Sequence, residues 1–170
     1  NQKGGVAKTT TAVNLTACIA AAGRRALLVD MDPQGGCAVC LGMDTTTLDR
    51  SVYDALIKPS MAIGDVVIST DFGFDLAPAN IDLAGAEIEL KQALAAETVL
   101  QRRLRTVLSE YDYIVIDTPP SLGILTVNSL PAANKVIIPI SAEYMALRGL
   151  HMLLDTLENV REVTNPSLQV

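Results

Sequence analysis

The chain begins with small residues and lysines that lead directly into an apolar segment. Residues 1–10 read NQKGGVAKTT, and the apolar run starts at Ala12. Small side chains let a backbone curve closely around an anion, and the N-terminus of the following helix favours negative charge. A loop of this kind normally follows a strand, so the opening segment favours an α/β fold built around a bound anion.

The charged and hydroxyl side chains of this loop suit a magnesium–phosphate group. Lys8 supplies a point charge, and the Thr9 hydroxyl is a suitable magnesium ligand. The common phosphate-loop pattern wants glycine six residues before the lysine and again just before it, where this chain has Gln2 and Ala7. The variant K-G-G-x-x-K-[ST]-[ST], starting at Lys3, fits at every fixed position. The alternative interpretation is a glycine-containing surface loop with solvated lysines.

This variant resembles the deviant Walker A ATPases, the ParA/Soj/MinD group. The resemblance implies that ATP is bound by the loop residues Lys3, Gly4, Gly5, Val6, Ala7, Lys8, Thr9 and Thr10. It also implies that Lys3 reaches the partner subunit's nucleotide across a dimer. A loop wrapped around its own phosphates tends to point Lys3 away from them, so this charge is best used in trans, like an arginine finger.

Two acids follow the next apolar run. Residues 26–29 predict a strand buried on both faces, and Asp30 and Asp32 follow it, where open α/β sheets bind ligands. A single acid there is more often a cap or turn former, but two acids after a phosphate loop favour a nucleotide site. The segment VDMDPQG resembles the second nucleotide motif of the ParA/Soj branch. That resemblance implies that Asp32 positions the attacking water and that Asp30 lies near the magnesium, touching it indirectly or mainly shaping the loop.

A further apolar run, residues 113–116, predicts another buried strand, which ends in Asp117 and continues as TPPS. A strand that ends in an acid is typical of a Walker B strand, so Asp117 is predicted to hold a magnesium-bound water opposite Thr9. In the resembled family this D-T-P-P-S loop is a switch that senses the γ-phosphate, and rigid prolines beside Gly123 suit such a switch.

The remaining patterns predict alternating helices and strands. Predicted helices span residues 9–22, 52–57, 82–109, 122–132 and 144–163, and predicted strands span 26–29, 72–77, 113–116 and 135–140. The first helix is apolar on most faces and should be buried, and Asp82 should cap the third. We therefore predict one α/β ATPase domain over residues 1–170, with a mostly parallel central sheet flanked by helices. Residues 167–170 resemble the start of another strand, and with no initiator Met we expect the natural protein to extend at both ends.

Residues 36–42 depart from the resembled family. They read GCAVCLG where partition ATPases commonly have NATSGLG, which puts any contacts of those polar residues in doubt. Cys37 and Cys40 are interpreted as small buried apolar side chains, and Cys18 lies on the helix predicted to be buried. The alternative is a cluster shared between two subunits, as in the nitrogenase iron protein, since two cysteines are too few for a site within one chain.

Two further groups of charged residues have ordinary explanations. Arg102, Arg103 and Arg105 are interpreted as a solvated helical face rather than a DNA patch, because acids precede them. His151, the only histidine, is predicted to be a surface or half-buried structural residue. The resembled family places its adenine-reading residues largely beyond Val170.

Composition limits the partners. The chain of 170 residues is 49% hydrophobic and carries a net charge of -6, which gives no global attraction to nucleic acid or an anionic membrane. Its three cysteines argue against a disulfide framework, and no apolar run reaches the roughly 20 residues of a membrane span. These features predict a cytoplasmic protein without a membrane contact, and the resemblance to partition ATPases implies that it associates with the nucleoid.

The resemblance implies an ATP-dependent dimerisation switch. Two subunits would sandwich ATP and Mg²⁺, bind DNA nonspecifically, and be reset by slow hydrolysis stimulated by a ParB-type centromere-binding partner. The alternatives are a MinD-like membrane-cycling ATPase, an iron–sulfur reductase, and a nucleotide-binding scaffold without catalysis. The cargo, whether chromosome, plasmid or another body, is not specified by the residues.

Overall fold

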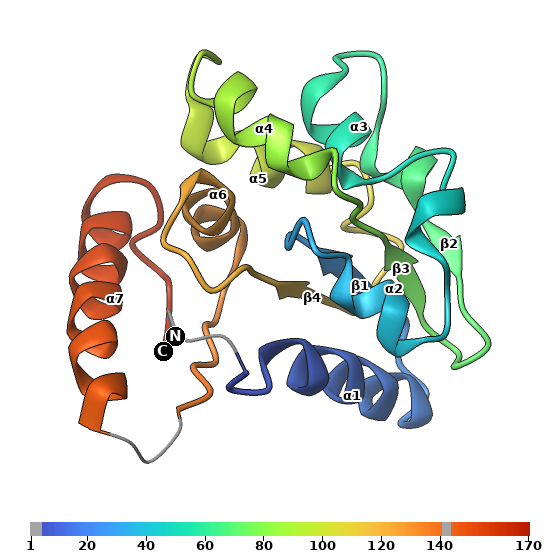
Figure 1. Ribbon diagram of the computed structural model, residues 1–170, viewed down its shortest axis with the longest axis horizontal. Helices are drawn as coiled ribbons and strands as arrows, with labels where there is room; N and C mark the ends of the chain where they lie inside the picture. The colour runs from blue at the N-terminus through green and yellow to red at the C-terminus, as the bar shows by residue number, and fades with distance from the viewer. Residues whose placement is uncertain (1–4, 141–143) are drawn as a thin grey trace.

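A four-stranded sheet in the order β2-β3-β1-β4 forms the centre of the described chain (Figure 1). The structure is a computed structural model that describes residues 5–140 and 144–170. The strands are β1 (Ala26–Asp30), β2 (Ile68–Ser69), β3 (Asp75–Ala77) and β4 (Tyr113–Asp117). The helices are α1 (Lys8–Ala21), α2 (Gly36–Cys40), α3 (Val52–Ile57), α4 (Leu83–Leu90), α5 (Val99–Leu104), α6 (Ile124–Ala132) and α7 (Tyr144–Val163), with 3-10 turns η1 (Thr45–Thr47), η2 (Ile63–Val66) and η3 (Ala96–Thr98).

Strand β1 occupies the middle of the sheet. It pairs in parallel with both β3 and β4, whereas the short β2 pairs antiparallel with β3. All five β1 residues are buried, as predicted for a strand covered on both faces. The β1–β4 register sets Asp30 opposite Asp117, so the parallel strands deliver both carboxylates to the same end of the sheet.

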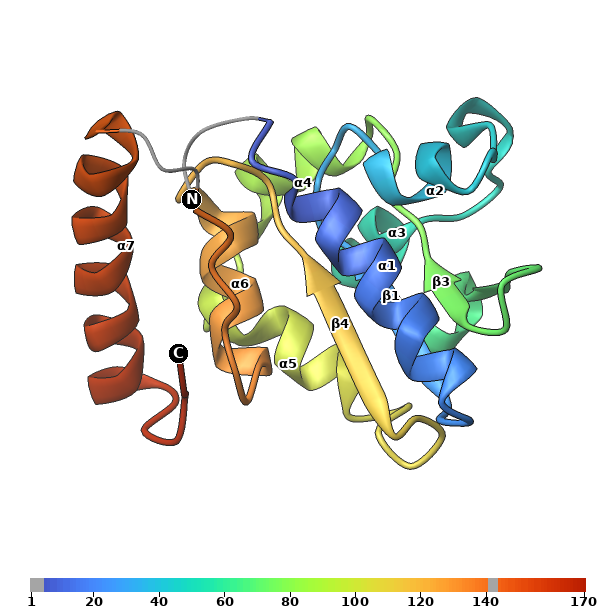
Figure 2. The ribbon, with the colours of Figure 1, turned by 90° about the horizontal axis from the view of Figure 1, so that it is seen from below.

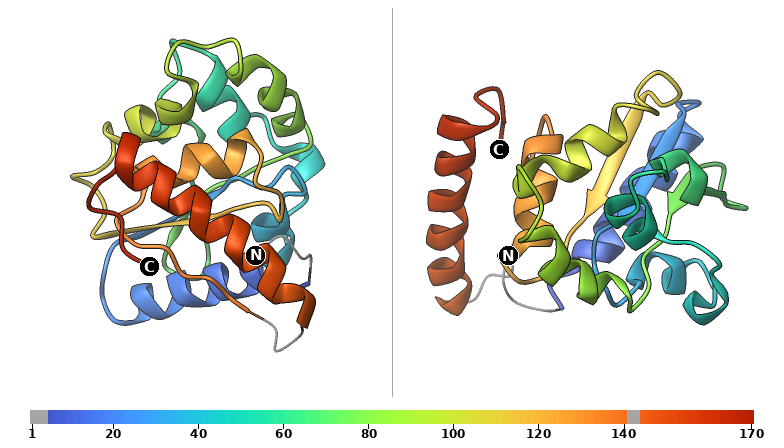
Figure 3. Two further views of the ribbon diagram at one scale, coloured as in Figure 1. Left: turned by 90° about the vertical axis from the view of Figure 1, so that its left-hand side faces the viewer. Right: turned by 90° about the horizontal axis from the view of Figure 1, so that it is seen from above.

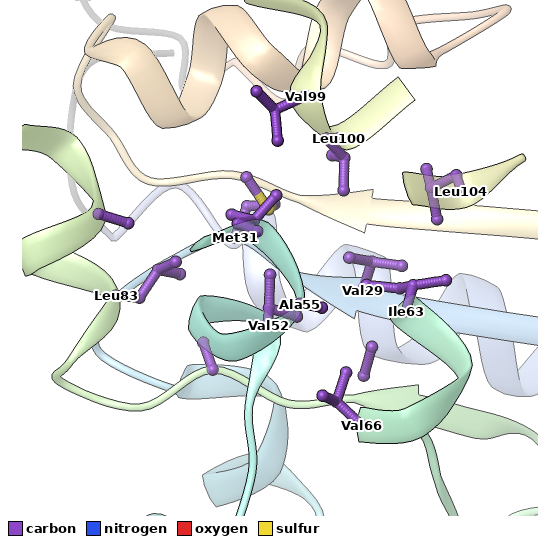
Figure 4. Packing of buried hydrophobic residues seen from close by; sticks show 14 of the residues in the cluster. Val29, Met31, Val52, Ala55, Ile63, Val66, Leu83, Val99, Leu100 and Leu104 are labelled. Atoms are coloured by element: carbon purple, nitrogen blue, oxygen red, sulfur yellow. The ribbon is translucent and has the colours of Figure 1, made fainter. Parts of the chain in front are cut away.

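Helices cover both faces of the sheet and make it a three-layer α/β domain. Helices α1 and α2 lie on one face, and α3, α4, α5 and α6 lie on the other (Figure 1). Successive β1 side chains alternate between these layers: Leu28 packs with Ala12 and Val13 of α1, whereas Val29 packs with the opposite layer. Figure 4 shows this second core, where α3, α5 and η2 close over Val29 and Met31.

Helix α7 packs outside these layers, against α6 (Figure 3). Its apolar stripe, Leu153, Leu157 and Val160, forms a small core with Leu130 and Leu168. The helix has the predicted bounds, and His151 is exposed on it as expected. No helix in residues 5–140 and 144–170 combines the length and apolar character that crossing a bilayer requires.

The strand predicted for residues 135–140 is not formed. In the described chain this segment makes one isolated parallel bridge, between Lys135 and Gln169, and Ile137 and Ile140 remain 60% and 50% exposed. The local pattern was that of a buried strand, but a strand needs a neighbour along its edge, and here the pairing stops at the bridge. The strand start predicted at residues 167–170 is likewise reduced to that bridge.

The helix predicted for residues 82–109 is broken in two. Helix α4 ends at Leu90, Ala95 takes a left-handed conformation with φ 53°, and α5 covers only Val99–Leu104. The buried Asn128 of α6 explains the break: it accepts from the Leu100 N–H at 3.1 Å and donates to the Ala96 carbonyl at 2.6 Å. Asp82 occupies the N-cap position of α4, but its side chain makes no capping hydrogen bond.

Three smaller predictions were also wrong. The first helix is not buried on most faces, because only Ala12, Val13 and Thr16 are buried on it. Strand β4 lies at an edge of the described sheet, with α1 running alongside it (Figure 2), and four of its five residues are incompletely buried. The predicted strand at residues 72–77 shrinks to Asp75–Ala77, because residues 70–74 form the turn that brings β2 alongside it.

Candidate functional site

The loop before α1 ends in a strained residue. Ala7 has φ 61° and ψ 30°, a left-handed conformation that favours glycine, and its carbonyl accepts the Thr11 N–H at 2.8 Å. Helix α1 therefore begins sharply at Lys8. The first N–H groups of a helix have no acceptor within it, so this turn presents donors suited to an anion. Gly5 is also left-handed, while Lys3 and Gly4 lie outside the described residues.

Thr9 in the first turn of α1 lies against the acidic end of β4, where its side chain hydrogen-bonds with Asp117. On its other side Thr9 packs on Gly36, where an added Cβ would sit 3.2 Å from the threonine methyl and 3.5 Å from its hydroxyl oxygen. The end of β4 and the start of α2 thus both contact the Thr9 side chain. The sequence predicts Asp117 opposite Thr9, and the fold brings these two residues together.

Asp30 is a fully buried carboxylate that organises the loop following β1. Its two oxygens accept the backbone N–H groups of Asp32 and Cys37, each at 3.0 Å. Burial raises the pKa of Asp30 to about 7, although both hydrogen bonds oppose that shift. These contacts support the expectation that Asp30 shapes the loop, and they place it beside Asp117 rather than facing solvent.

Asp117 is 3% exposed at the end of β4. Burial raises its pKa, while hydrogen bonds with Thr9 and Cys37 and the positive charge of Lys8 lower it. Its carbonyl accepts the Met31 N–H at 2.9 Å, which ties β4 to the loop after β1. A hydroxyl, a lysine and a carboxylate therefore meet here, the combination that binds a magnesium–phosphate group.

Asp32 lies near this cluster and is half-buried. Its side chain accepts the Gln34 N–H at 3.0 Å and its carbonyl accepts the Gly35 N–H at 2.9 Å, which closes a turn. The charge of Asp32 contributes to the raised pKa of Asp117, so the two carboxylates are close. Of the three acids predicted from the sequence, Asp32 is the least buried.

Cys37 is the member of the cluster that sequence reasoning missed. It is fully buried, and its thiol donates to Asp117 Oδ2 at 3.5 Å. The C-x-x-C spacing gave no sign of this contact, because α2 turns the two cysteines to different surroundings. Cys40 is exposed, contrary to prediction, and Cys18 on α1 is exposed as well. A cluster bridging two subunits needs both cysteines at one surface, which the burial of Cys37 prevents.

The arginines of the α5 region make contacts within the fold. Arg103 donates to the carbonyls of Lys58 and Pro59 at 3.2 and 3.3 Å, and Arg102 donates to the Thr98 hydroxyl at 3.1 Å. These bonds tie α5 to its surroundings. They agree with the interpretation of this stretch as a solvated helical face.

Comparison with known proteins identifies relatives over the whole chain. A family model described as an AAA domain matches residues 1–170. The sporulation initiation inhibitor protein Soj of Bacillus subtilis is 48% identical over 170 residues, which are 67% of that protein. The chromosome partitioning protein ParA of Myxococcus xanthus is 47% identical over all of this chain and 60% of its own length. The chain thus spans about two thirds or less of these relatives.

Solved structures agree with this likeness. Cobyrinic acid a,c-diamide synthase from Mycobacterium smegmatis, with bound ADP and magnesium, has a TM-score of 0.95 and 46% identity over 99% of this chain and 69% of its own. A plasmid partition protein from Borrelia burgdorferi has a TM-score of 0.85 and 30% identity over 99% of this chain and 72% of its own.

The central sheet, the loop at α1 and the converging strand ends define this chain as a phosphate-loop ATPase fold. Its residues carry the deviant form of the loop, and its similarity to Soj and ParA extends over its full length. The chain belongs to the ParA/Soj family of partition ATPases.

Proposed function

We propose that this chain is the nucleotide-binding part of a partition switch that binds Mg²⁺–ATP, dimerises, and is reset by slow hydrolysis. The convergence of Thr9 with Asp117 at the N-terminus of α1 carries this proposal. It sets a hydroxyl and a carboxylate side by side, the oxygen donors that Mg²⁺ prefers, next to helix N–H groups suited to phosphate. Relatives solved with ADP or an ATP analogue and magnesium support it.

Each site residue has a separate role. The loop from Lys3 to Thr10 encloses the phosphates, and Lys8 pairs with the β- and γ-phosphates. Thr9 would hold the metal directly, and Asp117 would hold it through a water. Magnesium, when bound, neutralises charge that develops on the phosphate oxygens.

The two acids that follow β1, Asp30 and Asp32, have different roles. Asp32, which is half-buried, orients the water that attacks the γ-phosphate. Asp30 holds the N–H groups of Asp32 and Cys37, and so keeps Asp32 in place. In this assignment Asp30 is a positioning residue, with no direct bond to the metal.

Dimerisation is the functional result of the ATP cycle. Lys3 reaches the nucleotide of the second subunit, so each site is complete only in the dimer. The net charge of -6 gives no global attraction to DNA, and nonspecific DNA binding requires a local basic surface of the dimer. A ParB-type protein stimulates hydrolysis, and the switch operates in the cytoplasm on the nucleoid.

The names of the relatives point to two kinds of function, partition and biosynthesis. The names chromosome partitioning protein ParA and plasmid partition protein point to partition, and one structural relative is named cobyrinic acid a,c-diamide synthase. Both would use the same phosphate chemistry, so ATP binding alone does not separate them. ATP-dependent retention on DNA does: a partition switch shows it, and a cobyrinic acid a,c-diamide synthase does not.

Size measurement of the full-length protein with ATP tests the mechanism. Asp32→Ala should retain ATP and accumulate as a dimer, because the water is no longer oriented. Loss of nucleotide binding in that variant would instead make Asp32 structural. Lys3→Ala should bind ATP yet remain monomeric, and normal dimerisation with normal hydrolysis would remove its proposed role in trans.

A further inference from the structure

Asp30, Cys37 and Asp117 bring three metal-binding atoms together inside the domain. Their ligand atoms all lie within 4.8 Å of one another, and all three side chains are buried. The three residues come from the end of β1, from α2 and from the end of β4, so the tertiary fold assembles the group. The role proposed above for magnesium uses Asp117 and leaves the thiol unexplained.

The spacing of the thiol and the Asp117 carboxylate matches a tetrahedral metal centre. Bonds of about 2.3 Å to sulfur and about 2.1 Å to oxygen, at a tetrahedral angle, put the two ligand atoms about 3.6 Å apart. Cys37 Sγ and Asp117 Oδ2 are 3.5 Å apart. A cation of zinc size therefore fits between them with little rearrangement.

The chemistry of the three ligands selects the kind of cation. Magnesium takes oxygen ligands in octahedral geometry, so a thiol offers it nothing. Thiolate with carboxylates suits a borderline-soft divalent cation such as Zn²⁺, which binds sulfur and oxygen at four positions. Three protein ligands leave the fourth position for water or a nucleotide oxygen.

The alternative is that Cys37 only fills space and donates a weak hydrogen bond. Two carboxylates at 0% and 3% exposure make that arrangement costly, because burial disfavours their charged forms. A divalent cation among them would offset that cost, whereas a neutral thiol does not. The buried acids therefore supply a reason, independent of the thiol geometry, for a cation at this point.

We propose that Asp30, Cys37 and Asp117 bind a thiophilic divalent cation of the zinc type at a position that overlaps the magnesium site. The thiol proton, and the proton of Asp30 where that acid is protonated, pass to solvent as the bonds to the metal form, and no electron is transferred. Bound zinc then occupies Asp117 and inhibits nucleotide hydrolysis. This inhibition rests on the proposed function of Asp117, whereas the binding itself does not.

Cobalt is the probe, because a thiolate bound to Co²⁺ produces a charge-transfer absorption band. The full-length protein is titrated with Co²⁺ without nucleotide until the absorbance is constant, and Zn²⁺ is then added to displace the cobalt. We expect the band in the wild-type protein, its loss on adding Zn²⁺, and at least a roughly 100-fold weaker affinity in Cys37→Ala, beyond the usual cost of losing an outer-shell partner.

Matched cysteine variants decide whether Cys37 is the ligand. Cys18→Ala and Cys40→Ala remove the two exposed thiols and should keep the full band. Cys37→Ser keeps the side-chain volume and a hydrogen-bond donor toward Asp117, and should lose the band with unchanged circular dichroism. No band in the wild-type protein, or an undiminished band in Cys37→Ser, would overturn the proposal. Because nucleotide is absent, neither result bears on the ATPase function.

Discussion

Asp30 and Asp117 are direct partners in the register of parallel strands β1 and β4, so two buried carboxylates share one end of the sheet. Each is held differently: Asp30 accepts two backbone N–H groups, whereas Asp117 receives hydrogen bonds from the side chains of Thr9 and Cys37. The backbone bonds suit a residue that shapes a loop. The side-chain bonds can be exchanged for a metal-bound water without unfolding the turn.

The buried Asp30 makes stability depend on pH in an unusual direction. Its folded pKa is about 7, above its ordinary value of 3.8, so the folded state holds a proton that the unfolded chain releases. The contribution of Asp30 to the free energy of unfolding is fully present at low pH and falls as the pH rises toward and through 7. We expect a loss of roughly 1–2 kcal/mol between pH 5.5 and 7. Urea unfolding in EDTA measures it, and Asp30→Asn, which cannot titrate, should flatten the profile. An equally steep profile in Asp30→Asn would contradict the assignment.

Replacing Asp117 should uncouple magnesium from nucleotide binding. Asp117→Asn removes the charge that orients the metal-bound water. We therefore expect the factor by which Mg²⁺ strengthens nucleotide binding, measured by titration calorimetry, to fall roughly 10–100-fold. Asp112→Asn is the control, since Asp112 precedes the other end of β4 and pairs with the exposed Arg25 at 3.0 Å. Equal effects of the two substitutions would show that the charge acts at long range rather than at the site.

Ala7→Gly should relieve strain in the loop before α1. Ala7 adopts φ 61°, a conformation that costs a non-glycine residue about 1–2 kcal/mol, whereas the extra freedom of glycine in the unfolded chain costs about 0.4–1 kcal/mol. Strain relief is the larger of the two effects, so we expect stability to rise by up to about 1 kcal/mol in urea unfolding. Ala7→Val should lower stability, because a β-branched side chain is still less tolerated there. A destabilised glycine variant would show that the loop is not strained.

Gly35 is required by space as well as by conformation. Its φ is 63°, and an added Cβ would sit 2.8 Å from the Thr45 methyl and 2.9 Å from the Ala79 carbonyl oxygen. Gly23 offers a matched control, with φ 76° and nothing within 4 Å of its built Cβ. We expect Gly23→Ala to cost about 1–2 kcal/mol from conformation alone, and Gly35→Ala to cost about 1–3 kcal/mol more from overpacking. Thermal and urea unfolding of both variants measures the difference, and equal costs would mean that the neighbours of Gly35 yield freely.

Asn128→Ala should loosen the start of α5. The side chain satisfies one N–H and one carbonyl of the η3–α5 junction while fully buried, and its loss leaves both unpaired at a cost of about 2–4 kcal/mol. Asn14→Ala is the control, because Asn14 makes a single exposed bond to the Thr10 carbonyl on α1. Hydrogen exchange should accelerate at Leu100 in Asn128→Ala. Unchanged protection there would show that α5 does not depend on this residue.

Much of the site could be predicted because its signals are local. The loop of residues 1–10, the acids at the ends of two apolar runs, and the bounds of α3 and α7 are written in spacing and periodicity along a few neighbouring residues. A strand that ends in an acid puts that acid at the carboxyl edge of a parallel sheet wherever the strand lies. For the same reason the meeting of Asp30 and Asp117 needed only the fold class, since the carboxyl ends of neighbouring parallel strands lie side by side.

Only the tertiary structure decided where distant side chains intervene. Asn128 breaks the helix predicted for residues 82–109 from about thirty positions away, and residues 135–140 lack the neighbour that their strand-like pattern calls for. The same holds for Cys37, whose thiol meets Asp117 across 80 residues of chain. The sequence by itself determined which chemical groups stand at the strand ends. Packing determined what touches them, because contacts between remote segments depend on the whole fold.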